Sequence, residues 1–302
     1  MKPKVIVIVG PTASGKTGAS IELAKRVNGE IVSADSMQIY KHMDIGTAKV
    51  TLEEADGIKH YMIDVVNPDE NFNVAIYKKM AEESIREIIE KGKTPIIVGG
   101  TGLYVNTLVN GIELNEVEDD GQVRILLEKR LEDEGIDALF EELEKIDPEA
   151  ASVIDKNNVR RVIRALEVYK ITGKTKTELD KESIKEPPFD YAIYGILTER
   201  EKLYERINYR VALMIEQGLV NEVKTLREKY QFSKTALQGL GYKEVIDYLD
   251  GNCTHAEMVE KLKMETRRYA KRQITWFKRD ERIKWIERDK IVDVIVCEND
   301  LK

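Results

Sequence analysis

The stretch "GPTASGKT", from Gly10 to Thr17, decides the fold of this 302-residue chain. It fits the phosphate-loop pattern of a glycine, four residues and then Gly-Lys-Ser/Thr. The apolar run from Val5 to Val9 before it predicts a buried strand, and residues 17–27 after it predict a helix. An ordinary glycine-rich turn is the alternative, but the order of strand, loop and helix favours a phosphate-binding loop.

This loop has a defined chemistry. Its backbone N–H groups and the N-terminus of the helix after it face an anion. Lys16 is expected to reach the outer phosphates, and the hydroxyl of Thr17 is placed for a metal ion. The loop alone does not say whether it serves a kinase, an ATPase, a GTPase or a transferase.

The first third of the chain alternates strand and helix. After the loop, strands are expected at 29–35, 61–66 and 94–100, with a helix at 74–91. Such alternation predicts the α/β class, with a P-loop NTPase-like parallel sheet core and helices on both faces. Binding residues then lie at the carboxyl ends of the strands, which brings the phosphate loop, Asp35 and residues 99–102 to one crevice.

The middle of the chain differs from its two ends. Residues 116–188 show charged amphipathic helical patterns and close with the breaker "KEPPFD". A strand-like run follows at 191–198, then long helices at 200–230 and 254–277 and a short "RIKWIER". We therefore expect residues 1–115 to form the first part of the core, 116–188 a helical insertion domain, and 189–302 the return to the core with basic C-terminal helices.

Composition narrows the class of protein. The chain is 42% hydrophobic and 34% charged, and no apolar run approaches the roughly 20 residues of a membrane helix. Two cysteines and three scattered histidines predict neither a disulfide framework nor a metal cluster. We expect a cytoplasmic protein without a membrane partner, and the lack of an apolar seam favours a monomer.

Charge is segregated along the chain. The net charge is −7, yet residues 263–279 carry seven Lys or Arg against one Glu, and residues 159–176 are similarly basic. Two basic segments on an acidic protein favour a localised face that binds a polyanion. Solvated helix faces with extended Lys and Arg side chains are the alternative.

The acidic residues near the phosphate loop help to identify the reaction that the loop serves. ATP-hydrolysing motors and switches carry an Asp at the end of a further strand to hold Mg²⁺. The strand at 94–100 ends in "VGGTGLY" with no acid, and Asp64 could fill the role or merely cap a turn. A small-molecule kinase stays possible, with Asp35 binding or deprotonating an acceptor hydroxyl.

Six stretches together resemble one family. They are "GPTASGKT" (10–17), "SADSMQIYKHMDIGTAK" (33–49), "VGGTGLY" (98–104), "RRVIRALEVY" (160–169), "QGLGYKE" (238–244) and "TRRYAKRQITWF" (266–277). They closely resemble the tRNA dimethylallyltransferase family over nearly the whole chain. That family transfers an isopentenyl group from dimethylallyl diphosphate to N6 of the adenosine 3′-adjacent to the anticodon, with Mg²⁺.

The resemblance implies a role for each matching residue. On the donor side, Lys16 and Thr17 bind diphosphate and metal, residues 12–17 line the prenyl-donor site, and Arg210 approaches the diphosphate within a looser match. On the acceptor side, residues 35–38 face the target adenosine and Thr101 lies beside it. The implied donor-site residues are Gly10, Thr12, Ala13, Ser14, Gly15, Lys16 and Thr17; the implied tRNA contacts are Asp35, Ser36, Met37, Gln38, Thr101, Arg124, Arg160, Arg161 and Arg164.

The residue types suit this reaction. The lone pair of an adenine amine is delocalised into the ring, so a carboxylate that takes the proton as the C–N bond forms assists alkylation. Asp35, at a strand end, is placed to be that base, although it could also cap the turn that follows it. The phosphate loop would then stabilise a departing diphosphate rather than transfer a phosphoryl group.

Three other readings stay open on the sequence. A prenyltransferase acting on free adenine nucleotides shares the chemistry, but the basic insertion favours RNA because a nucleotide has no stem to hold. A small-molecule kinase would transfer phosphate from ATP and ignore dimethylallyl diphosphate. A nucleotide-sensing RNA-binding module would not need Asp35 at all.

Overall fold

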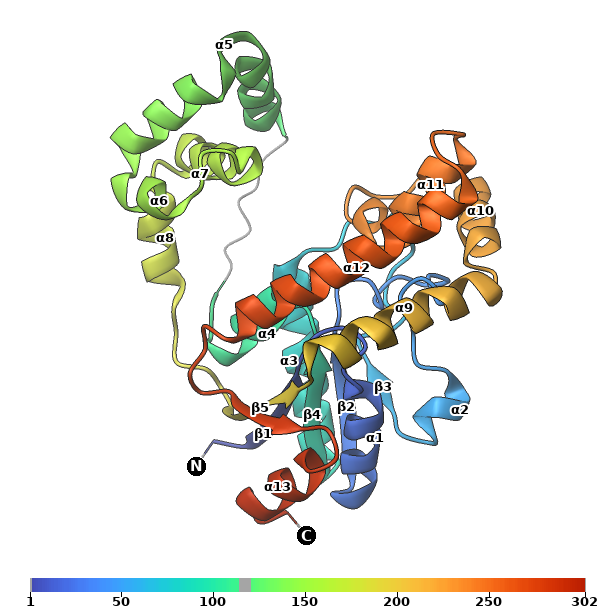
Figure 1. The fold of residues 1–302 in the computed structure, drawn as a ribbon. Helices are drawn as coiled ribbons and strands as arrows, with labels where there is room; N and C mark the ends of the chain where they lie inside the picture. The colour runs from blue at the N-terminus through green and yellow to red at the C-terminus, as the bar shows by residue number, and fades with distance from the viewer. Residues whose placement is uncertain (1, 114–120, 302) are drawn as a thin grey trace. The chain divides into compact units, whose positions relative to one another are not determined.

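The computed structural model describes residues 2–113 and 121–301. It divides into two compact units, one of residues 1–109 with 188–302 and the other of residues 110–187 (Figure 1). The second unit spans Asn110–Pro187. Its start is six residues before the predicted start of the insertion at 116, and its end is one residue before the predicted end at 188.

The first unit is built on one parallel sheet. In the described residues this sheet has six strands in the order β3-β2-β4-β1-β5-β6, and every neighbouring pair is parallel. The loop strand lies centrally, so its carboxyl end is flanked by those of two neighbours. The strands are β1 (Lys4–Val9), β2 (Gly29–Ala34), β3 (His60–Tyr61), β4 (Thr94–Gly99), β5 (Asp190–Leu197) and β6 (Lys284–Glu287).

The apolar residues of β1 point alternately to the two faces of the sheet. Helices pack on both faces and bury them. Val5, Val7 and Val9 belong to one core cluster, and Ile6 and Ile8 belong to another. The first cluster includes residues of α3 (Val74–Glu90) and α4 (Gly102–Val109), and the second includes residues of α1 (Lys16–Arg26) and α13 (Ile291–Glu298). Figure 1 shows α1 and α13 along the sheet. The predicted α/β fold with a parallel sheet and helices on both faces is confirmed.

The C-terminal helices extend the first cluster beyond the sheet. Gly218, at φ +98°, separates α9 (Arg200–Glu216) from α10 (Leu219–Lys229). They are followed by a 3-10 turn η1 (Ala236–Gln238), α11 (Tyr242–Leu249) and the long α12 (His255–Phe277), which packs against α9 (Figure 1). A short α2 (Leu52–Ala55) lies between β2 and β3.

Two expectations about this unit need correction. The predicted strand at 61–66 is wrong beyond its first residue, because Met62 and Asp64 adopt positive φ (+62° and +56°) and turn the chain out of the sheet. Further along, an isolated bridge joins Tyr40 to Val66. Helix α13, whose Ile291 and Ile295 are fully buried, was not predicted.

The second unit is mainly helical in its described residues after 121, with short loops between the helices. Its helices are α5 (Gln122–Ile146), α6 (Pro148–Val153), α7 (Val159–Thr172) and α8 (Lys176–Ser183). Leu139, Leu143 and Leu166 form its core, and a kink at Gly135 (φ +79°) bends α5. Asp147 caps α6 at Ala150 N (3.0 Å) and accepts hydrogen bonds from the N–H and hydroxyl of Thr177, so it fastens α8 to α6.

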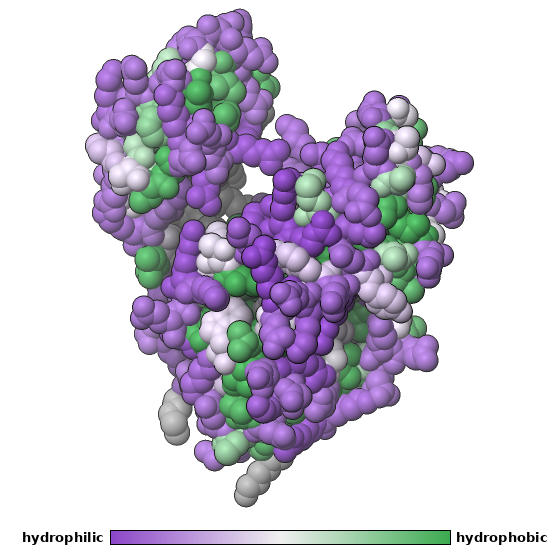
Figure 2. All heavy atoms as spheres, in the orientation of Figure 1, coloured by the Kyte–Doolittle hydropathy of each residue, from purple (hydrophilic) through white to green (hydrophobic). Residues whose placement is uncertain are grey.

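Hydrophilic side chains cover most of the visible surface of both units (Figure 2). Among residues 2–113 and 121–301, no helix has the length and apolar character needed to cross a membrane. Cys253 and Cys297 are both free thiols.

Candidate functional site

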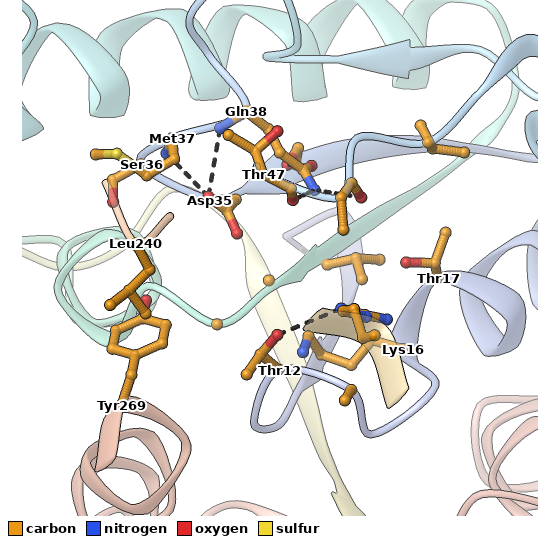
Figure 3. A pocket seen from close by; sticks show the side chains of 18 of the residues that line it. Thr12, Lys16, Thr17, Asp35, Ser36, Met37, Gln38, Thr47, Leu240 and Tyr269 are labelled. Carbon is orange, nitrogen blue, oxygen red and sulfur yellow. Dashed lines mark hydrogen bonds between the residues drawn. The ribbon is translucent and has the colours of Figure 1, made fainter. Parts of the chain in front are cut away.

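A cavity of about 560 Å³ opens at the carboxyl ends of β1, β2 and β4 in the first unit (Figure 3). Residues of the phosphate loop, Asp35 and Gly99 with Gly100 all line it, so the predicted convergence of three strand ends is confirmed. Helices α9 and α12 supply further walls. Its volume lies in the range of small-molecule sites, about 300–1,000 Å³.

The phosphate loop contains two residues with left-handed backbone angles. Ala13 adopts φ +62° and Gly15 φ +89°, and Gly15 is the N-cap residue directly before α1. Such left-handed positions turn successive N–H groups toward a common concavity, which makes an anion site at the helix N-terminus. Gly10 and Ser14 lie behind this surface, since neither lines the cavity.

Two cations lie in the cavity beside this loop. Lys16 Nζ donates to Pro11 O (2.7 Å), and Arg210 Nη1, from α9, donates to Thr12 Oγ1 (3.3 Å). Burial lowers the pKa of Lys16 to about 7, with the charge of Arg210 adding to the effect and that of Asp35 opposing it. Burial also lowers the pKa of Arg210. Two desolvated cations with neutral hydrogen-bond partners favour an anion between them.

Gln273, from α12, joins the loop to the next strand end. Its Oε1 accepts from Thr12 N (2.8 Å), and its Nε2 donates to Gly100 O (2.9 Å). A Cβ at Gly100 would lie 2.1 Å from that Nε2, so only glycine permits this approach. A single side chain on α12 thus fixes the relative positions of the phosphate loop and the end of β4.

Asp35 both caps a turn and faces the cavity. Its Oδ1 accepts from Met37 N (2.9 Å) and Gln38 N (3.4 Å), which is the turn-capping role that the sequence left open. Its second oxygen points away from the turn into the cavity (Figure 3). One carboxylate therefore holds residues 35–38 in place and keeps an oxygen directed toward a ligand.

Thr101 supports this turn from behind. Its Oγ1 accepts from Ser36 N (3.0 Å), and its own N–H donates to Ala34 O (3.1 Å). Thr101 itself does not line the cavity, whereas Ser36, Met37 and Gln38 do. Thr101 therefore lies beside the other predicted acceptor-side residues, but they line the cavity and Thr101 does not.

Helix α12 contributes further side chains whose role the sequence pattern did not predict. Tyr269, Arg272 and Gln273 all line the cavity at a spacing that puts them on one helix face. Burial raises the pKa of Tyr269, and the charge of Asp35 raises it further, so its hydroxyl stays protonated. The sequence feature that could have identified them as site residues is the mixture of aromatic, basic and amide residues in "RRYAKRQ". Leu240, from "QGLGYKE", also points into the cavity (Figure 3).

Asp64, which the sequence offered as a possible metal ligand, forms an ion pair outside the cavity instead. Its carboxylate forms a salt bridge with Lys49 Nζ (2.6 Å), and it does not line the cavity. Among the described residues, no group of three His, Cys, Asp or Glu side chains could hold a metal ion. Thr17 does line the cavity, beside Lys16.

The remaining predicted site residues belong to the second unit. Arg160, Arg161 and Arg164 are exposed on α7. Arg164 Nη1 lies 2.8 Å from the buried carboxylate of Glu167, and Arg124 Nη1 lies 3.6 Å from the same group. One buried acid thus orients two of the four arginines, and all four belong to a compact unit of their own.

Comparisons with known proteins agree on one family. The family model described as "IPP transferase" matches residues 38–280. A tRNA dimethylallyltransferase of Acetivibrio thermocellus is 55% identical over 287 residues, covering 94% of this chain and 92% of that protein. A tRNA dimethylallyltransferase of Halalkalibacterium halodurans is 49% identical and covers 95% of this chain and 92% of its own.

Solved structures give the same result. The full-length tRNA isopentenylpyrophosphate transferase from Bacillus halodurans matches with a TM-score of 0.74 at 45% identity, over 99% of this chain and 96% of that one. A eukaryotic dimethylallyltransferase acting on tRNA matches with a TM-score of 0.79 at 33% identity, over 95% of this chain and 74% of that one.

Proposed function

The chain belongs to the IPP transferase family, and we propose that it transfers a dimethylallyl group from dimethylallyl diphosphate to N6 of the adenosine 3′-adjacent to the anticodon in tRNA. The observation that carries this proposal is the cavity itself, where the cationic phosphate loop faces the carboxylate of Asp35. A site of this design can hold an anionic leaving group at one side and receive a proton at the other.

On the donor side, the loop N–H groups, Lys16 and Arg210 bind the diphosphate. As the allylic C–O bond breaks, negative charge accumulates on the diphosphate, and fixed cations in a desolvated site stabilise that charge. The anion also raises the pKa of Lys16 back from about 7, so that the ammonium is retained in the complex. No phosphoryl bond breaks in this step.

On the acceptor side, N6 forms a bond to the allylic carbon as the C–O bond to diphosphate breaks. The amine loses one proton in this exchange, and Asp35 accepts it through the oxygen that faces the cavity. Its other oxygen stays bonded to Met37 N, so the turn holds the base in position during the transfer. Ser36, Met37 and Gln38 line the same side and are the residues available to contact the base.

Magnesium would be held by Thr17 together with the diphosphate. Mg²⁺ in phosphate sites usually keeps several waters and takes only one or two protein oxygens. The hydroxyl of Thr17 in the cavity lining fits this pattern, and it requires no carboxylate cluster. The ion would neutralise part of the charge on the departing diphosphate.

The second unit is proposed to bind the tRNA. An adenosine in a single-stranded loop is extruded at lower cost than one in a duplex, and the enzyme must still hold the RNA on either side of it. The exposed arginines of α7, Arg160, Arg161 and Arg164, with Arg124 of α5, are suited to phosphate contacts. We propose that the protein acts as a monomer on the anticodon stem-loop.

A labelled-donor assay tests the function. The purified chain is mixed with unmodified tRNA, labelled dimethylallyl diphosphate and Mg²⁺, and the label in RNA is counted after precipitation. Parallel reactions replace tRNA by AMP, or the donor by labelled ATP with a small hydroxylated acceptor. We expect label in tRNA alone. Label in AMP would assign a nucleotide prenyltransferase, and phosphate transfer from ATP with no use of the allylic donor would assign a kinase.

A further inference from the structure

Glu222, on α10, binds a loop that lines the cavity although Glu222 does not line the cavity itself. Its Oε2 accepts from Asp44 N (3.0 Å) and Ile45 N (2.7 Å), and its Oε1 accepts from Gly46 N (3.1 Å). Three successive backbone N–H groups thus converge on one carboxylate, an arrangement that fixes the loop strongly because charge-assisted hydrogen bonds are the stronger kind.

The loop held in this way carries the partners of Gln38. Gln38 Nε2 donates to Thr47 O (3.3 Å) and Ala48 O (3.4 Å), and its Oε1 accepts from Ser33 Oγ (3.2 Å). Gln38 also belongs to the turn capped by Asp35. The position of loop 44–48 therefore determines the orientation of an acceptor-side side chain that faces the cavity.

Tyr242 connects the same carboxylate to a second loop. Its hydroxyl donates to Glu222 Oε1 (2.6 Å), and the side chain is fully buried. A Cβ at Gly46 would lie 2.5 Å from its ring, and a Cβ at Gly239 would lie 3.0 Å from it. The ring therefore packs between two glycines, one in each loop, and the neighbouring Gln238 and Leu240 line the cavity.

The donor side has a separate support. Lys16, Arg210 and Thr12 are held by contacts with Pro11, one another and Gln273, and none of these contacts involves Glu222 or Tyr242. The two sides of one cavity are thus fixed by different side chains. A change at Glu222 should reach the acceptor side first.

From this geometry we propose that Glu222, with Tyr242, is a positioning residue for the RNA acceptor: it fixes loops 44–48 and 238–242 so that Gln38 and Leu240 contact the target adenosine correctly. The proposal rests on the proposed function, because it needs an RNA base at this side of the cavity. It assigns no contact with substrate to Glu222 itself.

The test compares Glu222→Ala with the exposed Glu228→Ala on the same helix as a matched control. Steady-state transfer gives kcat and KM for tRNA, and calorimetry gives the affinity for dimethylallyl diphosphate. Because small displacements of a reacting group cost rate steeply, we expect kcat/KM for tRNA to fall by about tenfold to a hundredfold in Glu222→Ala. The donor affinity should change less than about twofold, and Glu228→Ala should match the wild type.

Tyr242→Phe keeps the ring and removes only the hydroxyl, so it tests the link if Glu222→Ala does not fold. It should show a smaller loss, about threefold to tenfold in kcat/KM for tRNA, again without a change in donor affinity. Parallel losses of donor affinity and tRNA turnover, or wild-type values in both variants, would overturn the proposal. A wild-type protein that transfers no label to tRNA would instead overturn the proposed function.

Discussion

The two sides of the cavity are built in different ways. The donor side is largely one continuous stretch, residues 10–17, whose backbone angles are set by its own glycines and alanine. The acceptor side combines the turn at 35–38, loop 44–48, loop 238–242 and helix α12, which are far apart in sequence. These pieces are held together by hydrogen bonds that Thr101 and Glu222 accept and that Gln273 donates.

This difference determines which substitutions should disturb each side of the cavity. A local anion loop retains its shape when distant residues other than its partners Gln273 and Arg210 change, because its backbone angles depend on neighbouring residues. The acceptor side depends on long-range contacts, so a change at α10 or α12 can displace it. We therefore expect some variants to lose transfer without losing donor binding, and a variant of the side chain that joins the two sides to lose both.

The largest effect is expected for Asp35→Asn. The amide oxygen can still accept from Met37 N and keep the turn, but the side chain can no longer take the proton from N6. Transfer should fall by about 10²–10⁴-fold while donor affinity stays near the wild-type value. Single-turnover transfer and calorimetry on the same preparation provide both numbers. Retained transfer would mean that another group or water is the base.

A smaller but broader effect is expected for Gln273→Ala. This change leaves Thr12 N and Gly100 O without their partner and uncouples the loop from β4. Both donor affinity and tRNA turnover should fall, each by about tenfold, since an unpaired buried polar group costs about 1–3 kcal/mol. The exposed Glu260→Ala on the same helix, outside the basic segment 263–279, is the control. A loss confined to one side of the cavity would show that Gln273 does not connect the two.

The donor side should also show its own pH dependence. The pKa of free Lys16 is lowered to about 7, chiefly by burial, and a bound anion raises it. Lys16 is therefore neutral above pH 7 in the free protein but charged in the complex, so pyrophosphate affinity should fall as pH rises, by up to about tenfold per unit. Calorimetry on the wild type and Lys16→Met separates this effect from the titration of pyrophosphate. Parallel pH profiles would contradict it.

The smallest effect is expected in the second unit. Arg161 is exposed and in α7, so Arg161→Ala should lower the slope of log affinity for tRNA against log salt by about one unit. The exposed Lys129→Ala on α5 is the comparison. Filter binding at several salt concentrations measures both slopes. A flat salt response in the wild type would remove the case for α7 as an RNA face.

Sequence reasoning was most successful where structure is local. The phosphate loop, the placement of Asp35 and the apolar strands around them could be predicted, because these depend on neighbouring residues and on alternation. The run at 61–66 misled, since its apolar residues suit a strand while Met62 and Asp64 adopt left-handed backbone angles that bend the chain away.

The roles of residues that act through distant contacts could not be predicted from the neighbouring sequence. Gln273 and Glu222 are ordinary polar residues within helical patterns, and their importance follows only from partners 173 and 177 residues away. Helix α13 was missed because its short apolar run, "IVDVIV", does not distinguish helix from strand by periodicity. The family resemblance supplied roles such as that of Arg210, which periodicity alone could not assign.

The most direct test of the central claim is a crystal structure of the protein with Mg²⁺ and dimethylallyl thiolodiphosphate, an analogue that resists cleavage. We predict that its phosphates lie in the loop concavity between Lys16 and Arg210, with the metal at Thr17 and the allylic carbon directed toward the free oxygen of Asp35. Phosphates bound outside the loop, or an allylic group that points away from Asp35, would contradict the claim that one cavity joins a donor cradle to an acceptor base.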